Sequence, residues 1–182
     1  KPGLNQKDSW QYMQEMLPLV QDLWRGDVAH EGRFWQFPSA TSCPKPLQQT
    51  VPMWVAARSP ITFDYAVAND CNIMSWPLTL PFSEAVKYRT QLDEAIAKNG
   101  GTYAGRFAMM RHTSVYETAS DRQSALDATR GVLSQFGNLI MKSGEVRNGF
   151  PDPVPLESLD GNFRVEPKML EDNLMFGSPS QV

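Results

Sequence analysis

Three strand–helix units follow one another between residues 53 and 142, and this alternation constrains the fold more than any other feature of the chain. Short apolar runs predict strands, and each is followed by a segment with apolar residues at helical spacing. The expected pairs are strand 53–57 with helix 60–69, strand 72–76 with helix 82–98, and strand 107–116 with a helix opened by a capping box at Ser120 and running to about 142. Such an order produces parallel strands joined by helical crossovers, so the fold class is α/β.

The segments around these units have other patterns. Residues 6–25 predict an amphipathic helix, which Pro18 is expected to kink or locally break. Residues 28–37 predict a small hairpin turning at Glu31-Gly32. Residues 144–166 are rich in proline, glycine and acidic residues, and a loop of this length predicts either a lid or an insertion.

Composition excludes several classes of protein. The 182 residues are 41% hydrophobic and 20% charged, which is typical of a globular domain. A net charge of −3 argues against binding to nucleic acid or to an acidic membrane surface, because both carry negative charge. No apolar run is long enough to span a membrane, and no signal peptide is visible. The two cysteines have neither metal-site nor disulfide spacing, so we expect no metal and a cytoplasmic location.

The turn between the first strand and its helix is a candidate anion site. Ser59 is placed to cap the helix and Pro60 to be its first residue, which leaves backbone N–H groups pointing towards the carboxyl end of the strand. In parallel α/β proteins ligands bind at that edge, and a helix N-terminus favours an anion. The hydroxyls of Ser59 and Thr62 are one turn apart and would add two donors. The alternative is that Ser59 only caps its helix.

The two histidines carry less information. His30 lies in the expected hairpin, where a surface or structural role is the simpler interpretation. His112 follows Arg111 in the third strand, and strand alternation places only one of these two side chains inside a barrel. The sequence leaves open which one it is. An inward-facing His112 would contact substrate or flavin, whereas the alternative is a structural histidine.

Three linked stretches resemble one known family. "DLWRGDVAHEGRFWQF", "PKPLQQTVPMWVAARSPITFDYAVANDCNIMSW" and "FGSPSQV" occur in the order and spacing of the bacterial-luciferase-like flavin monooxygenases. The resemblance covers almost the whole chain. It implies that residues 1–182 are part of a single (β/α)8 TIM-barrel domain, covering its middle and later part.

The resemblance also implies a cofactor site. In that family the turn after the fifth barrel strand binds the phosphate of reduced FMN, and the matching positions are Arg58, Ser59 and Thr62. Arg58 departs from the acidic residue of the luciferase itself, which leaves a side-chain role for it open. Trp76 ends the next strand, where the flavin ring would lie. It either stacks beside the ring or packs under the following loop. Its neighbour Ser75 is a further candidate at this place.

The implied activity is that of a flavin-dependent monooxygenase. Reduced FMN from a separate flavin reductase would react with O2 to a C4a-peroxyflavin that oxygenates a small organic substrate, and the family resemblance allows a homodimer. One alternative is a deazaflavin-dependent oxidoreductase of the same superfamily. Another is a non-catalytic flavin-binding or partner subunit, which Arg58 mildly favours. The catalytic residues are unknown.

The chain ends give a further expectation. Ser178, Pro179 and Gln181 form a helix start signal, yet only Val182 follows, and the chain begins at Lys1 rather than Met. We therefore expect a piece of a longer protein. A partial barrel has open strand edges, so this piece is expected to be unstable and inactive alone.

Overall fold

A computed structural model describes residues 5–78, 80–141, 146–152, 155–162 and 165–182. The chain divides into two compact units, residues 1–51 and residues 52–182. The prediction that residues 1–182 belong to a single barrel domain stays a prediction, and the units are described separately.

The first unit is a helix with a hairpin. A short 3₁₀ turn, η1 (Gln6–Asp8), leads into α1 (Ser9–Arg25), as the apolar spacing predicts. The helix continues through Pro18, so the expected local break does not occur. Strands β1 (Val28–Glu31) and β2 (Gln36–Ala40) pair antiparallel, which confirms the predicted hairpin.

One carboxylate holds the hairpin on the helix. Glu15 of α1 accepts hydrogen bonds from the backbone N–H groups of Phe34 and Trp35, each at 3.1 Å. Its Oε1 also lies 3.0 Å from Nε2 of His30. Burial alone would favour the neutral acid, but the bonds from His30 and from the two N–H groups outweigh it and lower the pKa of Glu15.

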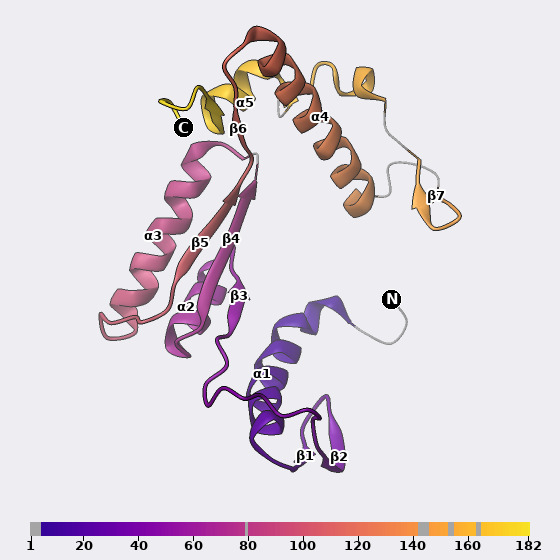
Figure 1. The fold of residues 1–182 in the computed structure, drawn as a ribbon. Coiled ribbons are helices and arrows are strands. Elements are labelled where there is room, and N and C mark those ends of the chain that lie inside the picture. Colours follow the sequence, from indigo (N-terminus) through magenta and orange to yellow (C-terminus); the bar gives the residue numbers. More distant parts are fainter. Residues whose placement is uncertain (1–4, 79, 142–145, 153–154, 163–164) are drawn as a thin grey trace. The chain divides into compact units, whose positions relative to one another are not determined.

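The second unit begins with three parallel strands. Strands β3 (Trp54–Ala56), β4 (Asn72–Leu78) and β5 (Phe107–Arg111) are adjacent in this order, and the crossovers are α2 (Pro60–Ala68) and α3 (Phe82–Lys98). These elements confirm the predicted strand–helix units to within two residues for the first two pairs. Figure 1 shows α2 and α3 on the same side of this sheet.

The core of this unit lies between the sheet and the two helices. Val55 and Ile73 are neighbours in register and are both buried. They meet Phe63 of α2, which is fully buried and whose ring is 6.2 Å from that of Phe107. Because apolar burial is the main driving force of folding, this face is fixed towards the helices.

The third predicted strand, 107–116, is not continuous. It divides at His112 into β5 and β6 (Thr113–Val115), and β6 pairs in parallel with β9 (Met175–Gly177) instead of β4. The division has a physical reason, since the N–H of His112 bonds to Leu78 O on one side while its carbonyl accepts from Met175 N on the other. A strand that changes partners cannot be recognised from its own residues.

The last helices form a second, smaller core. Helix α4 (Ala119–Met141) begins one residue earlier than predicted, and its cap is Thr118, whose Oγ1 accepts from Asp121 N at 3.1 Å. The expected capping box at Ser120 is therefore wrong. Helix α5 (Pro167–Asn173) packs against α4 through a buried apolar cluster: Leu126, Leu170, Leu174 and Phe176.

The predicted lid segment lies only partly within the described residues. It contains β7 (Val146–Arg147), β8 (Phe150–Pro151) and the 3₁₀ turn η2 (Leu156–Leu159), and the two short strands pair antiparallel. Residues 142–145, 153–154 and 163–164 fall outside the description. A lid role for residues 144–166 stays a prediction.

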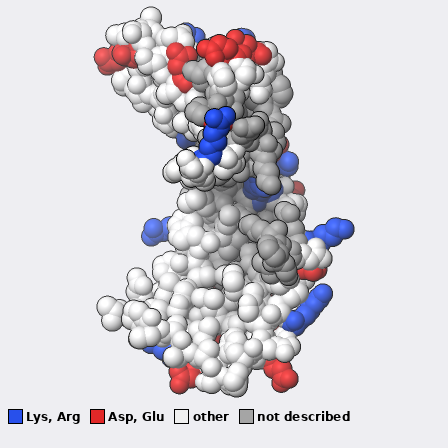
Figure 2. Space-filling view, turned by 90° about the vertical axis from the view of Figure 1, so that its right-hand side faces the viewer, with Lys and Arg blue, Asp and Glu red and all other residues white. Residues whose placement is uncertain are grey.

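Charge on the molecule is unevenly spread in the view of Figure 2. Basic side chains stand apart from one another there, while acidic side chains gather at the upper end of the view. Most of the described surface in Figure 2 belongs to uncharged residues.

Candidate functional site

The turn between β3 and α2 is closed by two hydroxyl side chains. Ser59 N donates to Thr62 Oγ1 at 3.2 Å, which is the reciprocal bond of a capping box. Thr62 Oγ1 donates to Ser59 O at 2.8 Å and lies 3.0 Å from Ser59 Oγ, so both hydroxyls bond within the turn in this structure. The structure therefore confirms that Ser59 begins the helix, with Pro60 as its first residue.

The first turn of α2 still offers donors to a ligand. The N–H groups of Thr62 and Phe63 bond to Ser59 O at 3.0 and 3.2 Å, and Pro60 has no N–H. For Ile61 N–H, no partner is found within the described residues, and the Ile61 residue is exposed. Arg58, which precedes the helix, is exposed. An amide and a guanidinium at a helix N-terminus, with two hydroxyls that a ligand could draw from their bonds within the turn, are a donor set that fits a phosphate.

The strand ends bring the predicted residues to one edge of the sheet. Because β3, β4 and β5 are parallel, their carboxyl ends lie at the same edge. Ser59 follows β3, Trp76 lies near the end of β4, and His112 directly follows β5. The predicted site residues thus share the edge at which ligands bind in parallel α/β proteins.

Alternation along β4 decides which face Trp76 occupies. Ile73, Ser75 and Pro77 are buried towards the helices, whereas Met74 is exposed and Trp76 half-buried. Trp76 is therefore on the face that α2 and α3 do not cover. By strand register and alternation that open face carries a mainly apolar set of side chains: Trp54, Ala56, Met74, Trp76, Ala108 and Met110.

Alternation also places the side chain of Arg111. Phe107 packs against the core under the helices, and Met109 and Arg111 line a hollow on that side. His112 lies between β5 and β6, where the strand changes partners, so alternation does not fix the direction of its side chain. An inward-facing His112 stays a prediction. His112 is half-buried, and burial lowers its pKa, so its imidazole is neutral at pH 7.

Arg111 has a structural position instead. Its guanidinium donates to Leu80 O at 2.7 Å and also to Asn173 O, which joins the end of β4 to the end of α5. The hollow it lines has a volume of about 660 Å³ and lies between α3 and the segment from α5 to the C-terminus. This hollow is on the helix side of the sheet, away from the predicted site.

Two further residues at this edge concern the site. Leu78, at the end of β4, has φ of +38°, a left-handed conformation that leucine rarely adopts. Strained backbone of this kind is often found at functional sites, and the sequence interpretation did not single out Leu78. Ser75, which the sequence named as a neighbour of Trp76 near the flavin ring, is fully buried, and its Oγ donates to Ala57 O at 2.8 Å.

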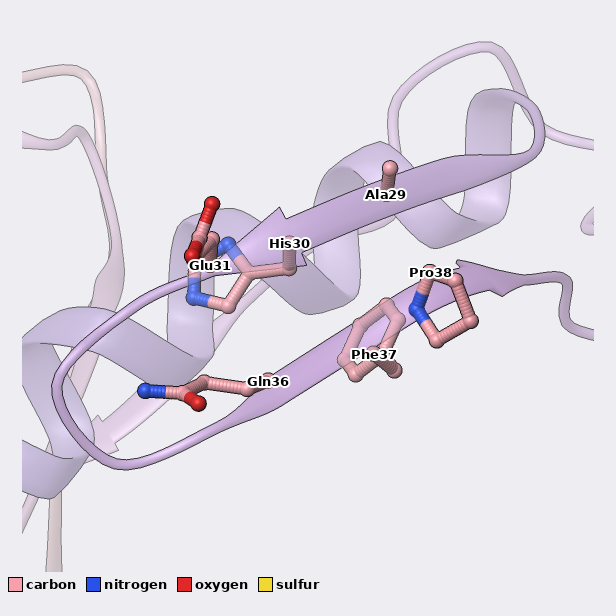
Figure 3. Close-up of a pocket in the computed structure, with 6 residues that line it drawn as sticks. All are labelled: Ala29, His30, Glu31, Gln36, Phe37 and Pro38. Atoms are coloured by element: carbon pink, nitrogen blue, oxygen red, sulfur yellow. The ribbon is translucent and has the colours of Figure 1, made fainter.

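The second histidine lies in the first unit. Figure 3 shows His30 and Phe37 on the two strands of the hairpin, beside an open hollow of about 450 Å³. The imidazole of His30 is committed to Glu15, as described above, which agrees with the structural interpretation of this residue.

Other site types were also considered. Among the described residues, no group of three or more His, Cys, Asp or Glu side chains is placed to hold a metal ion. Cys43 is exposed and Cys71 buried, and both are free thiols. No helix in the described part of the chain combines the length and apolarity that crossing a bilayer requires.

Comparison with known proteins agrees with this geometry. The family described as luciferase-like monooxygenase matches residues 2–182. The chain belongs to this family. Among luciferase-like relatives, it is 33% identical over 182 residues to the flavin-dependent trigonelline monooxygenase, oxygenase component, of Acinetobacter baylyi. That match covers 100% of this chain and 51% of the relative, so the chain spans about half the length of this curated relative.

Two solved structures support the luciferase-like fold. The match to the monooxygenase RslO1 from Streptomyces bottropensis covers 96% of this chain and 55% of the RslO1 chain, with a TM-score of 0.58 and 19% identity. An F420-dependent secondary alcohol dehydrogenase, in complex with an F420-acetone adduct, gives a TM-score of 0.54 and 19% identity. That match covers 89% of this chain and 50% of the dehydrogenase chain. At such identities the likeness concerns the fold alone, which is TIM-barrel-like α/β.

Proposed function

We propose that the full-length protein is a flavin-dependent monooxygenase that uses reduced FMN and O2 to oxygenate a small organic substrate. The observation that carries this proposal is the position of the α2 N-terminus, with its hydroxyl and amide donors, at the same sheet edge as Trp76 and His112. Membership of the luciferase-like family and the flavin-dependent relative support it.

Each residue of the predicted site has a role in this proposal. Ser59 and Thr62 hydroxyls and the Ile61 N–H hold the phosphate, where the helix dipole also favours negative charge. Arg58, the exposed residue immediately before Ser59, adds positive charge to this anion site. Trp76 lies beside the flavin ring on the open face of the sheet.

His112 is assigned to the substrate. His112 directly follows β5 at the same sheet edge as Trp76, and burial lowers the pKa of its imidazole, which favours the neutral form. A neutral imidazole has one N–H donor and one acceptor nitrogen, so it can orient a polar group on an otherwise apolar molecule. The methionines of the open face, Met74 and Met110, supply adaptable apolar contact.

The open face of the sheet fits the inside of a complete barrel. Trp54 and Met110 are each 47% exposed, which is unusual for large apolar side chains on a strand. In a closed (β/α)8 barrel such side chains fill the interior. Closure would also keep water from the flavin, which supplies the oxygen-activating chemistry when bound. The expected route of oxygen transfer stays a prediction.

A reductase partner follows from the relative. That protein is named the oxygenase component of a trigonelline monooxygenase, and an oxygenase component implies a separate source of reduced flavin. We therefore include a flavin reductase as a partner of the full-length protein and use trigonelline as the first substrate probe. A homodimer, a lid formed by residues 144–166 and a cytoplasmic location stay predictions.

The test uses the full-length protein, a flavin reductase with NADH and FMN, and ¹⁸O2. Trigonelline and other small heteroaromatic acids are supplied as substrates, and products are analysed by mass spectrometry. The proposal predicts one ¹⁸O atom in a product that requires both FMN and the protein. Anaerobic transfer of hydride from reduced F420 to a substrate, with no ¹⁸O incorporated into any of the substrates, would contradict the proposal and favour the deazaflavin alternative.

A further inference from the structure

Ser75 is a polar residue in an apolar environment. It lies on the helix-facing side of β4 between Ile73 and Pro77, and it is fully buried. A buried hydroxyl without a partner would be destabilising, so its hydrogen bond matters. That bond leaves β4 altogether, since Ser75 Oγ donates across to the carbonyl oxygen of Ala57 at 2.8 Å.

Ala57 is held by β4 through both of its backbone groups. Its N–H donates to Met74 O at 3.0 Å, and its C=O accepts from Ser75. Ala57 is itself fully buried and lies one residue beyond the end of β3. The peptide at which the chain leaves the sheet is therefore fixed by the neighbouring strand.

This fixed peptide stands next to the start of α2. Only Arg58 separates Ala57 from Ser59, the residue that begins the helix. With so short a connection, a rotation of the Ala57 carbonyl changes the direction in which Ser59 and the following N–H groups point. Donors that hold a ligand need support from residues behind them to keep their geometry.

We propose that Ser75 is a positioning residue: its hydroxyl fixes the Ala57 carbonyl and thereby aims the donors of Ser59, Ile61 and Thr62 at a flavin phosphate. This inference rests on the proposed function, because it concerns the same site. It adds Ser75 to the residues of the phosphate site, although Ser75 does not touch the ligand and lies on β4 rather than in the turn after β3.

A purely structural hydrogen bond would have another signature. It would stabilise the sheet, and its loss would affect every flavin equally or none. A positioning role affects only the ligand that carries a phosphate. FMN and riboflavin share the isoalloxazine ring and differ in the phosphate, so the ratio of their dissociation constants reports on the phosphate site alone.

The experiment is an anaerobic titration of the full-length protein with reduced FMN and reduced riboflavin. The variants are Ser75→Ala, which removes the donor, and Ser75→Thr, which keeps a hydroxyl. The matched control is Ser134→Ala, because Ser134 is 5% exposed and its hydroxyl bonds within its own segment, to Gly131 O at 2.7 Å. If Ser75→Thr does not fold, Ser75→Cys replaces it as a variant of similar size with a weak donor.

We expect Ser75→Ala to raise the Kd for FMN about three- to tenfold and to change that for riboflavin less than about twofold, since one hydrogen bond is at stake. Ser75→Thr or Ser75→Cys should restore part of the selectivity, and Ser134→Ala should keep the wild-type ratio. An unchanged ratio in Ser75→Ala, or equal losses for both flavins, would overturn the positioning role. A wild-type protein that does not prefer FMN to riboflavin would instead overturn the phosphate site itself.

Discussion

Arg111 and His112 are consecutive in the chain, and both join the end of β5 to other elements. Arg111 reaches Leu80 O and Asn173 O through its side chain, whereas His112 bonds to Leu78 O and Met175 N through its backbone. The guanidinium of Arg111 is therefore committed to the fold, and the imidazole of His112 is the group that the proposed function assigns to the substrate.

The protonation of His112 gives the first prediction. Burial places its pKa below the ordinary 6.5, so the native state favours the neutral imidazole. The resulting stability is complete above about pH 6.5 and is lost as the pH falls towards the native pKa. NMR of the full-length protein, with His112→Gln to assign the signal, should give a titration midpoint below 6.5. A midpoint above that value would contradict the burial of the imidazole.

The hydroxyls of the β3–α2 turn give the second prediction. Ser59→Ala and Thr62→Ala should each weaken FMN binding by about 0.5–1.5 kcal/mol, the usual contribution of one hydrogen bond, or more if the phosphate is doubly charged. Calorimetric titration of the full-length protein measures this directly.

Both variants also lose a helix cap, so a control is needed. Thr118→Ala removes the comparable cap of α4 and should lower the stability by about 0.5–2 kcal/mol without any effect on FMN affinity. If Ser59→Ala and Thr62→Ala lower the melting temperature but leave FMN affinity unchanged, the residues only cap the helix.

Gly32 gives the third prediction. A Cβ atom there would lie 2.1 Å from Glu15 Oε1 and 2.4 Å from His30 Nε2. Glu15 cannot move away without losing its bonds to the hairpin, so Gly32→Ala should destabilise the first unit by about 1–3 kcal/mol. Gly26→Ala is the control, because nothing lies within 4 Å of its Cβ position. Equal melting temperatures for the two variants would refute this close approach.

The fourth prediction concerns acid stability. The pKa of Glu15 is lowered in the native state from its ordinary 4.5, because the bonds from His30 and from two backbone N–H groups outweigh burial. This contribution to stability is present above about pH 4.5 and is lost as the pH falls through the native pKa.

Thermal unfolding of the wild type and of Glu15→Gln, measured between pH 7 and pH 3, checks this contribution. The difference in melting temperature should stay constant down to about pH 4.5 and shrink below that value, where the native carboxylate becomes protonated. Glu31→Gln removes an exposed carboxylate from the same hairpin and controls for net charge. A difference that does not vary with pH would mean that Glu15 does not act through its charge.

Local signals in the sequence predicted most of the second unit. The strand–helix alternation from β3 to α3 and the turn at Ser59-Pro60 depend on periodicity and on cap residues, which neighbours in sequence determine. The division at His112 depends on a partner strand more than 60 residues away, since Thr113 pairs with Met175. No local pattern contains that information.

The site shows the same limit. Ser59, Thr62, Trp76 and His112 were predicted from a helix start, from strand ends and from the family resemblance, and the structure places them at one edge of the sheet. Their roles toward a ligand stay predictions. Glu15 was not found, and Ser75 was named only as a neighbour of Trp76. Each acts through a backbone group that lies far from it in the sequence: Phe34 and Trp35 for Glu15, and Ala57 for Ser75.

The most direct test of the account is a crystal structure of the full-length protein with FMN. We predict that the phosphate lies at the N-terminus of α2, with its oxygens within about 3.2 Å of the Ser59 and Thr62 hydroxyls and the Ile61 nitrogen. The ring should lie over the open face beside Trp76. A phosphate bound elsewhere, or a turn closed off by packed side chains, would contradict the account.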